Sequence, residues 1–415
     1  MKTKTKGSVK DLLDYYQKTY ESQKDRNRIR DFFDSSLEDS LMPKKKIWSY
    51  VKKVLDKSWA FSYSSPQGDE GLRMNLAERY LNNIKLADDF MVTSGAQEAF
   101  TIIIQYLSKL TKKNMRVGVE EFSYIGFRHV LAEQKCRIKY LKLSNEGVNI
   151  NNLTKELKKG LDLIYVVPDL QNPTGVVYSE DNRRQLRKLQ EKYNFWLIVD
   201  LSYRDLYFDE ADMPGITMFN HKRTFLVGSF SKTMFPSLRV GWLYYPKMNN
   251  DLLLVRRSID LFQPTFLQLA VSKYLNCDYS SHLDRVRTIM KDKKNLLIKE
   301  LNENGFGKKF QWNDVQGGYY LWLRRIDGKS CQSDINKWAN KGVIVASGVY
   351  FNLTSGSDYI RLCFARLDVN QIIQTIKRIG YLNRDNQRTG VSRKSRSRIC
   401  VKVQVWLKDI NNKYV

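Results

Sequence analysis

The sequence has few of the residues that build disulfide frameworks and metal sites. Its 415 residues include 5 cysteines and 3 histidines. The cysteine count is odd, and no two cysteines have the spacing of a CxxC pair. We therefore expect neither a disulfide framework nor a bound metal, and the composition is typical of a protein from the reducing cytoplasm. So few histidines also leave little material for a histidine-centred catalytic triad.

Long apolar runs and phosphate-binding glycine loops are missing as well. No apolar stretch approaches the ~18 residues of a membrane span, and the basic N-terminus lacks the apolar core of a signal peptide. The patterns GxGxxG and GxxxxGK[ST] do not occur. We expect no membrane association, and the absence of both patterns argues against dinucleotide-binding and P-loop proteins.

Positive charge, in contrast, is in large excess. The sequence contains 70 Lys and Arg and 44 Asp and Glu, which gives a formal net charge of +26. A nucleic-acid partner is one interpretation. Because the basic residues are spread along the chain, we favour a generally basic surface with affinity for small anionic substrates, and we do not expect nucleic acid to be bound.

Apolar segments of strand and helix character alternate through the middle of the chain. Strands are expected at residues 91–92, 115–119, 163–167, 196–199 and 224–227. Helical spacing covers, among others, residues 96–110 and 180–193 between them. The alternation predicts a mostly parallel sheet with helices on both faces. In such a sheet, ligands bind beyond the carboxyl ends of the strands.

The 42% hydrophobic content is ample for a chain of more than one domain. We expect an N-terminal arm and helix at residues 1–60 and a large domain at 61–262. A small α+β domain at 263–382 would contain strands in GGYYLWLRR, GVIVASG and DYIRLCFA. A basic tail at 383–415 has no assigned role, although its segment ICVKVQVWL alternates like a strand.

A lysine follows the expected strand at 224–227, in the segment SFSKTMFPSLRVGW. A loop lysine is usually a solvated charge. Lys232 lies in a segment poor in charge, where partial desolvation would give it the lowered pKa that Schiff-base chemistry needs. Ser229, Ser231 and Arg239 could surround a phosphate with hydroxyls and a planar guanidinium.

A carboxylate ends the apolar segment WLIVD. Taken alone, Asp200 could be a helix cap or a surface residue. A buried carboxylate could also keep a pyridine nitrogen protonated, which would maintain such a ring as an electron sink. Tyr203 could reach the phenolic oxygen of the same ring, or could simply be a core aromatic.

Two other expected strands are followed by polar turns. Asn172 lies in QNPTG, an ordinary turn sequence, and could donate to the same phenolic oxygen. The segment SGAQ at residues 94–97 separates a strand from a helix, and its exposed amides are suited to an anion. The alternative for this segment is an ordinary helix cap by Ser94.

In this order and combination, the four segments resemble the fold-type I enzymes that use pyridoxal 5'-phosphate (PLP), in the class I/II aminotransferase family. The likeness covers about residues 31–380. It is greatest to the aminotransferase domains of MocR-type regulators and to aminoadipate and kynurenine aminotransferases. The regulators carry a winged-helix domain before this region, and we expect none here. Ser123 departs from the Pro or Gly that relatives often have at this position.

The resemblance implies a fold with a large PLP-binding domain and a small C-terminal domain, and it implies a role for each residue. Lys232 corresponds to the catalytic lysine that binds PLP as a Schiff base, and Asp200 to the acid paired with the ring nitrogen. The phosphate of PLP would be contacted by Ser94, Gly95, Ala96, Gln97, Ser229, Ser231 and Arg239. The phenolic oxygen would be contacted by Asn172 and Tyr203, and the ring face by Tyr124. Tyr63 would reach the phosphate in the neighbouring subunit.

Substrate binding is implied for two residues. Arg361 in DYIRLCFA corresponds to the arginine that grips the substrate α-carboxylate, and Asn172 would lie beside the substrate. An arginine in an apolar strand is costly unless it is paired, and a bidentate carboxylate would satisfy it. A structural salt bridge is the alternative.

The predicted function is transfer of an amino group between an amino acid and a 2-oxo acid by a cytoplasmic, PLP-dependent homodimer with shared active sites. Another PLP-dependent reaction, such as elimination, cyclisation or decarboxylation, is an alternative because the same cofactor residues serve all of them. A PLP-binding regulator without turnover is a third possibility, with its basic tail on nucleic acid. No motif indicates the substrate side chain.

Overall fold

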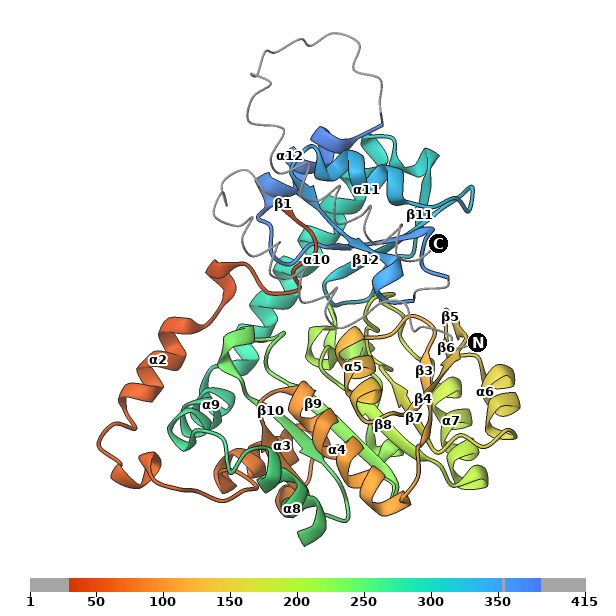
Figure 1. Cartoon of the computed structure of the whole chain (residues 1–415). Helices are drawn as coiled ribbons and strands as arrows, with labels where there is room; N and C mark the ends of the chain where they lie inside the picture. Colours follow the sequence, from red (N-terminus) through yellow and green to blue (C-terminus); the bar gives the residue numbers. More distant parts are fainter. Residues whose placement is uncertain (1–29, 353–354, 382–415) are drawn as a thin grey trace. The chain divides into compact units, whose positions relative to one another are not determined.

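The computed structural model describes residues 30–352 and 355–381 (Figure 1). The chain divides into two compact units. The large unit comprises residues 36–291 and 315–318, and the described residues of the small unit are 30–35, 292–314, 319–352 and 355–381. Residues 1–29 of the predicted N-terminal arm and helix (1–60) lie outside the described residues, as does the basic tail with the expected strand in ICVKVQVWL.

The large unit is built on a seven-stranded sheet (Figure 1). The strand order is β2 (Phe90–Thr93), β10 (Gly241–Tyr244), β9 (Thr224–Ser229), β8 (Trp196–Asp200), β7 (Leu163–Val166), β3 (Arg116–Glu120), β4 (Arg137–Leu141). The pairs from β9 to β4 are parallel, and β10 is antiparallel to both of its neighbours. All strands except β10 therefore end at the same edge.

Each face of this sheet has its own apolar core, because successive strand residues point to opposite sides. In β7, Ile164 and Val166 pack with one cluster, whereas Leu163 and Tyr165 pack with the other. The first cluster includes residues from helices α3 (Glu70–Leu81), α6 (Ile150–Leu157), α7 (Glu180–Tyr193) and α9 (Thr265–Cys277). The second includes residues from α4 (Ala96–Thr111), α5 (Ile125–Glu133) and α8 (Asn250–Ile259).

Helix ends follow the local sequence. Ser179 caps α7 by accepting a hydrogen bond from Asn182 N, two acidic residues lie in the first turn, and Asn194 ends the helix in the left-handed conformation. In α12 (Val369–Ile379), Asp368 and Gln371 form a reciprocal capping box. Of the described residues, none forms a helix long and apolar enough to span a membrane.

The small unit contains an antiparallel sheet with the order β11 (Phe310–Trp312), β12 (Tyr320–Arg325), β15 (Tyr359–Cys363), β14 (Ala346–Ser347). β1 (Arg30–Asp31) pairs in parallel with β13 (Val343–Ile344). Helices α11 (Gln332–Ala339) and α12 belong to this unit. The segment GVIVASG thus holds two short strands in two different sheets, where one strand was predicted.

The limit between the units differs from the predicted limit at residues 262 and 263. It falls within helix α10 (Tyr279–Glu303). The reason is that α9, which the sequence assigned to the small domain, packs against α2 (Lys44–Lys52) and α3 of the large unit.

Candidate active site

Two of the predicted site residues of the large unit are the last residues of parallel strands in its sheet. Asp200 is the last residue of β8, and Ser229 is the last residue of β9. Gly241, the first residue of β10, pairs with Ser229 on one side and with Thr93 on the other. This pairing brings the ends of β2 and β9 together across one antiparallel strand.

Lys232 lies in a tight turn just after β9. The turn is closed by a hydrogen bond from Met234 N to Phe230 O at 2.8 Å, and the carbonyl oxygen of Thr233 is 2.6 Å from Nε2 of His282. The lysine side chain is half-buried, and its Nζ is 5.9 Å from the centroid of the Tyr203 ring. The lysine and the tyrosine predicted to serve one ligand are therefore neighbours.

Asp200 is buried beside this lysine. Its Oδ2 accepts a hydrogen bond from Tyr165 Oη at 2.7 Å, and its Oδ1 accepts one from Ser202 N at 2.9 Å. Burial raises the pKa of Asp200, whereas hydrogen bonds from Ser202 and Tyr165 and the charge of Lys232 lower it. A buried carboxyl group held in this way is suited to a cationic partner, because a positive charge would offset the cost of burial.

Tyr165 fixes the direction of that carboxyl group. Its ring stacks on Phe127 of α5 with centroids 4.1 Å apart and meets Phe100 of α4 edge-on at 5.5 Å. Burial and the neighbouring Asp200 raise the pKa of Tyr165 well above its usual value. The phenol therefore stays protonated at neutral pH and donates to Asp200.

The start of α4 provides the predicted anion cradle. Gly95 is the N-cap, with a φ of 79°, so the alternative in which Ser94 caps the helix is wrong. First-turn amides have no acceptor within their own helix and can donate to an anion. A Cβ on Gly95 would lie 3.2 Å from Nη2 of Arg239, and a Cβ on Gly241 would lie 2.6 Å from Gly95 Cα. A side chain at Gly95 or Gly241 would crowd these neighbours, so glycine is required at both positions.

Arg239 joins the two halves of the cradle. It has a left-handed backbone with a φ of 53°, and its Nη2 donates to the carbonyl oxygen of Ser94. Ser229 Oγ lies 3.0 Å from Ser231 Oγ and accepts from Ser231 N at 3.2 Å. Helix amides, hydroxyls and a guanidinium thus come from two segments that the paired strands hold side by side.

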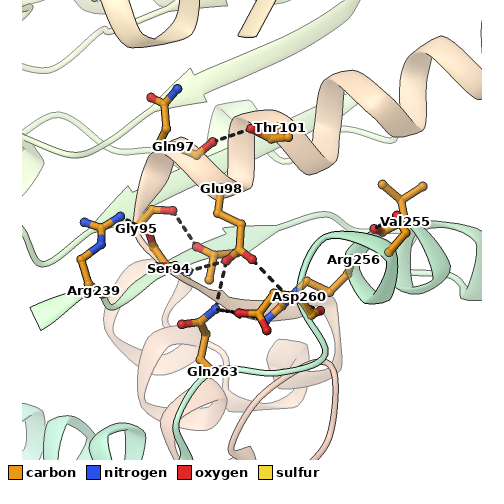
Figure 2. Close-up of polar contacts among 12 residues, drawn as sticks. Ser94, Gly95, Gln97, Glu98, Thr101, Arg239, Val255, Arg256, Asp260 and Gln263 are labelled. Carbon is orange, nitrogen blue, oxygen red and sulfur yellow. Dashed lines mark hydrogen bonds and ion pairs between the residues drawn. The ribbon is translucent and has the colours of Figure 1, made fainter. Parts of the chain in front are cut away.

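A polar cluster surrounds Glu98 beside the cradle (Figure 2). Its carboxylate accepts a hydrogen bond from Ser94 N and lies 3.2 Å from Nη1 of Arg256. Gln263 Nε2 is 3.3 Å from the same carboxylate and 2.8 Å from Asp260 Oδ2. Burial raises the pKa of Glu98, and Arg256 opposes the rise. Because Glu98 occupies the Ser94 amide, the amides of residues 95–97 are the better candidates for anion binding.

The turn that contains Asn172 follows β7. It is stabilised by hydrogen bonds of the Gln171 side chain. Gln171 Oε1 accepts from Thr174 N at 3.0 Å and from Thr174 Oγ1 at 2.7 Å. Its Nε2 donates to Glu120 Oε2 at 2.8 Å. Asn172 is 6% exposed and lies in the turn that these side-chain hydrogen bonds span.

Tyr124 and Gln97 meet at Gly126, in the first turn of α5. Gln97 Nε2 donates to Gly126 O at 2.9 Å. A Cβ on Gly126 would lie 2.5 Å from Gln97 Oε1 and 2.6 Å from Tyr124 Cε1. Ala96 and Tyr124 also pack against the same apolar cluster. Tyr124, the predicted ring-stacking tyrosine, therefore adjoins the cradle. Ser123, which stands where relatives often have Pro or Gly, is buried directly before it.

Tyr63 is 86% exposed, and its ring meets Phe262 edge-on at 5.7 Å. The structure places it on the surface of the large unit and does not bring it to the cradle of its own chain. Its predicted role concerns the neighbouring subunit.

Arg361 lies on β15 of the small unit and is 5% exposed. Its guanidinium carbon is 4.2 Å from the centroid of the Tyr320 ring and 4.9 Å from that of Phe351. Nη2 donates to the carbonyl oxygen of Phe33 at 2.8 Å. Aromatic faces and one carbonyl thus hold the planar fork of the guanidinium in place.

Sequence reasoning missed Glu120, Tyr165 and Glu98. Glu120 had a readable signal, since it ends a buried apolar run as Asp200 does. Tyr165 was hidden within an apolar strand, and the contact between Glu98 and Arg256 joins positions far apart in the chain.

The donor set of the large unit fits the parts of PLP. The amine of Lys232 can bind the carbonyl carbon of PLP, and the buried carboxyl group of Asp200 can bind its ring nitrogen. The cradle that contains Gly95 can bind its phosphate. In the described part of the chain, no group of His, Cys, Asp or Glu could hold a metal ion. This fold, with these groups at one sheet edge, is that of the fold-type I PLP enzymes.

The family model for aminotransferase class I and II matches residues 35–379, and the chain belongs to this family. Aromatic-amino-acid aminotransferase 1 of Thermococcus litoralis is 27% identical over 80% of this chain and 82% of that protein. 2-Aminoadipate transaminase of Thermus thermophilus is 26% identical over 82% and 86%. YdfD, an uncharacterized HTH-type transcriptional regulator of Bacillus subtilis, is 27% identical over 80% and 69%.

Solved structures agree on the fold. α-Aminoadipate aminotransferase LysN from Thermus thermophilus, complexed with N-(5'-phosphopyridoxyl)-L-leucine, has a TM-score of 0.78 and 25% identity and covers 87% of this chain and 93% of its own. Kynurenine aminotransferase of Pyrococcus horikoshii has a TM-score of 0.79 and 24% identity, with 90% and 96% covered. The predicted fold class, with a mostly parallel sheet in a large domain and a small α+β C-terminal domain, is confirmed.

Proposed function

We propose that this chain is a PLP-dependent aminotransferase that moves an amino group between an amino acid and a 2-oxo acid. The observation that carries the proposal is that Lys232 lies beside the buried Asp200 at the sheet edge that also holds the anion cradle. We assign cofactor attachment to Lys232 and phosphate binding to the amides of residues 95–97, Ser229, Ser231 and Arg239. Asn172 and Tyr203 would contact the phenolic oxygen, and Tyr124 the ring face.

When bound, PLP supplies a cationic ring that accepts the electron pair left on the substrate α-carbon after deprotonation. Asp200, oriented by Tyr165, would hold the proton on the ring nitrogen. Lys232 Nζ would take the α-proton of the substrate as general base and return it to the carbon that derives from the cofactor's aldehyde group. Tethering on a short turn sets its geometry.

We assign substrate recognition to Arg361 on the basis of its surroundings. The aromatic rings of Tyr320 and Phe351 and the carbonyl oxygen of Phe33 hold the planar guanidinium in a fixed orientation. A guanidinium held in this way is suited to a bidentate contact with a substrate carboxylate. This role favours substrates that keep their α-carboxylate throughout the reaction, and so disfavours decarboxylation.

Covalent trapping tests the cofactor assignment. The purified protein, loaded with PLP, is reduced with borohydride and digested, and the labelled peptide is sequenced. Label on Lys232 is expected, and Lys232→Ala should take up no label. Label on another lysine would refute the assignment of this site.

A screen of amino donors then separates transamination from elimination, cyclisation and other PLP reactions. Each amino acid is mixed with the loaded protein, and the released product is identified. Transamination yields one 2-oxo acid per cofactor in a single turnover and requires an acceptor oxo acid to continue. Ammonia release without an acceptor would instead indicate elimination.

The similarity to HTH-type transcriptional regulators makes a regulatory function the alternative to catalysis. Retention on DNA that weakens steeply with salt, without turnover of any amino acid, would favour it. We expect catalysis and no specific retention.

Homodimer formation is part of the proposal. The large unit exposes Trp48, Trp59, Phe61 and Tyr63, each more than half accessible. Large apolar side chains in such number near one another in sequence are typical of an interface. Light scattering should give twice the mass of 48.8 kDa, and Trp59→Glu should shift the protein toward that monomer mass.

A further inference from the structure

Glu120 is a buried carboxyl group that the proposed chemistry leaves without a role. It ends β3 and is fully buried. Its Oε1 accepts hydrogen bonds from Val167 N at 3.0 Å and from Tyr178 Oη at 2.6 Å, and its Oε2 accepts one from Gln171 Nε2 at 2.8 Å. A buried carboxyl is costly unless its oxygens are satisfied, so this arrangement has a structural or functional purpose.

The contact with Gln171 has a defined polarity. Gln171 Oε1 accepts two hydrogen bonds from Thr174, through N and Oγ1. Gln171 Nε2 donates to Glu120 Oε2 and to the carbonyl oxygen of Phe122, the latter at 2.6 Å. Turning the amide over would set its NH₂ group against the Thr174 amide and its oxygen against two acceptors. An acceptor at Glu120 therefore selects one orientation of Gln171.

Gln171 in turn defines the backbone on both sides of Asn172. Its own N donates to Val176 O at 2.9 Å, and its carbonyl oxygen accepts from Gly175 N at 2.6 Å. Together with the two side-chain bonds to Thr174, these contacts close the turn around Asn172. The backbone turn that carries Asn172 is thus held by Gln171, and the amide of Gln171 is oriented by Glu120.

We propose that Glu120 is a positioning residue of the cofactor site: it holds Gln171, and through it the turn that presents Asn172 to the phenolic oxygen of PLP. The inference rests on the proposed function, in which Asn172 contacts that oxygen. Glu120 touches neither substrate nor cofactor. Burial raises its pKa to about 7 while its three hydrogen bonds act in the opposite direction, which agrees with a tightly enclosed group.

Glu120→Gln tests the link because it preserves size and burial but puts an amide donor against the Gln171 donor. The readout is the pH midpoint of the absorbance change of the bound cofactor, which responds to hydrogen bonds at the phenolic oxygen. We expect E120Q to move this midpoint in the same direction as Asn172→Ala. PLP affinity, measured by dialysis of the apoprotein, should weaken about 3- to 10-fold, as for one lost hydrogen bond.

Two further variants separate positioning from simple stabilisation. Tyr178→Phe removes another donor to Glu120 without touching Gln171, so it should lower the melting temperature but leave the midpoint unchanged. In the double variant E120Q/N172A, the midpoint should equal that of N172A alone, since Glu120 acts only through Asn172. If E120Q does not fold, Gln171→Met tests the same link from the other side and should also move the midpoint.

The outcomes distinguish this inference from the function on which it rests. If borohydride fails to label Lys232, the proposed function and this inference both fall. If Lys232 is labelled but E120Q lowers only the melting temperature, Glu120 is a structural fastening and this inference alone is wrong. The inference would also be overturned if the pH midpoint of E120Q/N172A differed from that of N172A by the full shift seen for E120Q alone. An unchanged midpoint in N172A would overturn it as well.

Discussion

Replacing Glu120 by glutamine should remove a specific pH dependence of stability. Burial raises the pKa of this carboxyl from 4.5 to about 7 in the folded chain. The native state therefore keeps a proton between these values that the unfolded chain has released, so raising the pH across this interval favours unfolding. At ~1.4 kcal/mol for each pH unit, the contribution is about 3 kcal/mol, fully present below about pH 4.5 and lost above about pH 7. Glutamine cannot titrate and shows none of it.

Denaturant unfolding of the apoprotein at a series of pH values measures this effect. The use of apoprotein avoids the added stability that a bound cofactor would contribute. Other groups titrate in both proteins, so the relevant quantity is the difference in unfolding free energy between wild type and E120Q. This difference should fall by about 3 kcal/mol as the pH rises through the interval, whatever constant offset the mispaired amide adds. A difference that stays flat with pH would show that Glu120 does not titrate there.

Three other predictions concern the site and the chain end. Asp200→Ala should leave PLP bound but slow single-turnover α-proton exchange at least 100-fold, about 3 kcal/mol of lost electrostatic stabilisation; exchange near the wild-type rate would exclude Asp200 as the partner of the ring nitrogen. Arg361→Lys should raise the apparent KM for amino acids without weakening PLP binding, because lysine cannot make a two-pronged contact. An equal loss with simple alkyl amines would assign Arg361 a structural role. Deletion of residues 384–415 should leave PLP binding, transamination and dimer mass intact, and loss of any of them would make the tail part of the fold.

Strands of the large unit's sheet could be predicted from the sequence where they are apolar and are followed by polar turns. β3, β7, β8 and β9 were predicted in this way. β10 was missed, although its residues GWLY begin two positions after Arg239. Its apolar stretch was read only as the surroundings of the arginine, and its antiparallel insertion between β2 and β9 depends on pairing between distant segments.

The candidate site was readable to the extent that its residues occupy strand ends. Lys232, Asp200 and the start of α4 follow this rule. The side chains that orient them were not readable, because their partners are remote. Tyr165 is 35 residues from Asp200, and the aromatic rings around Arg361 come from Tyr320, Phe351 and the region of Phe33. Such contacts follow from three-dimensional packing and leave no local pattern.

The fastening of the Asn172 turn also has a consequence for biosynthesis. Glu120 is separated from Gln171 by 51 residues and from Tyr178 by 58. These bonds can form only after β3 and β7 have emerged and paired, and contacts of such long range form slowly. All of these residues lie between positions 120 and 178, so the turn around Asn172 can be stabilised on the ribosome before strands β9 and β10 have been synthesised. A chain that ends before Tyr178 lacks one of the hydrogen-bond donors to Glu120.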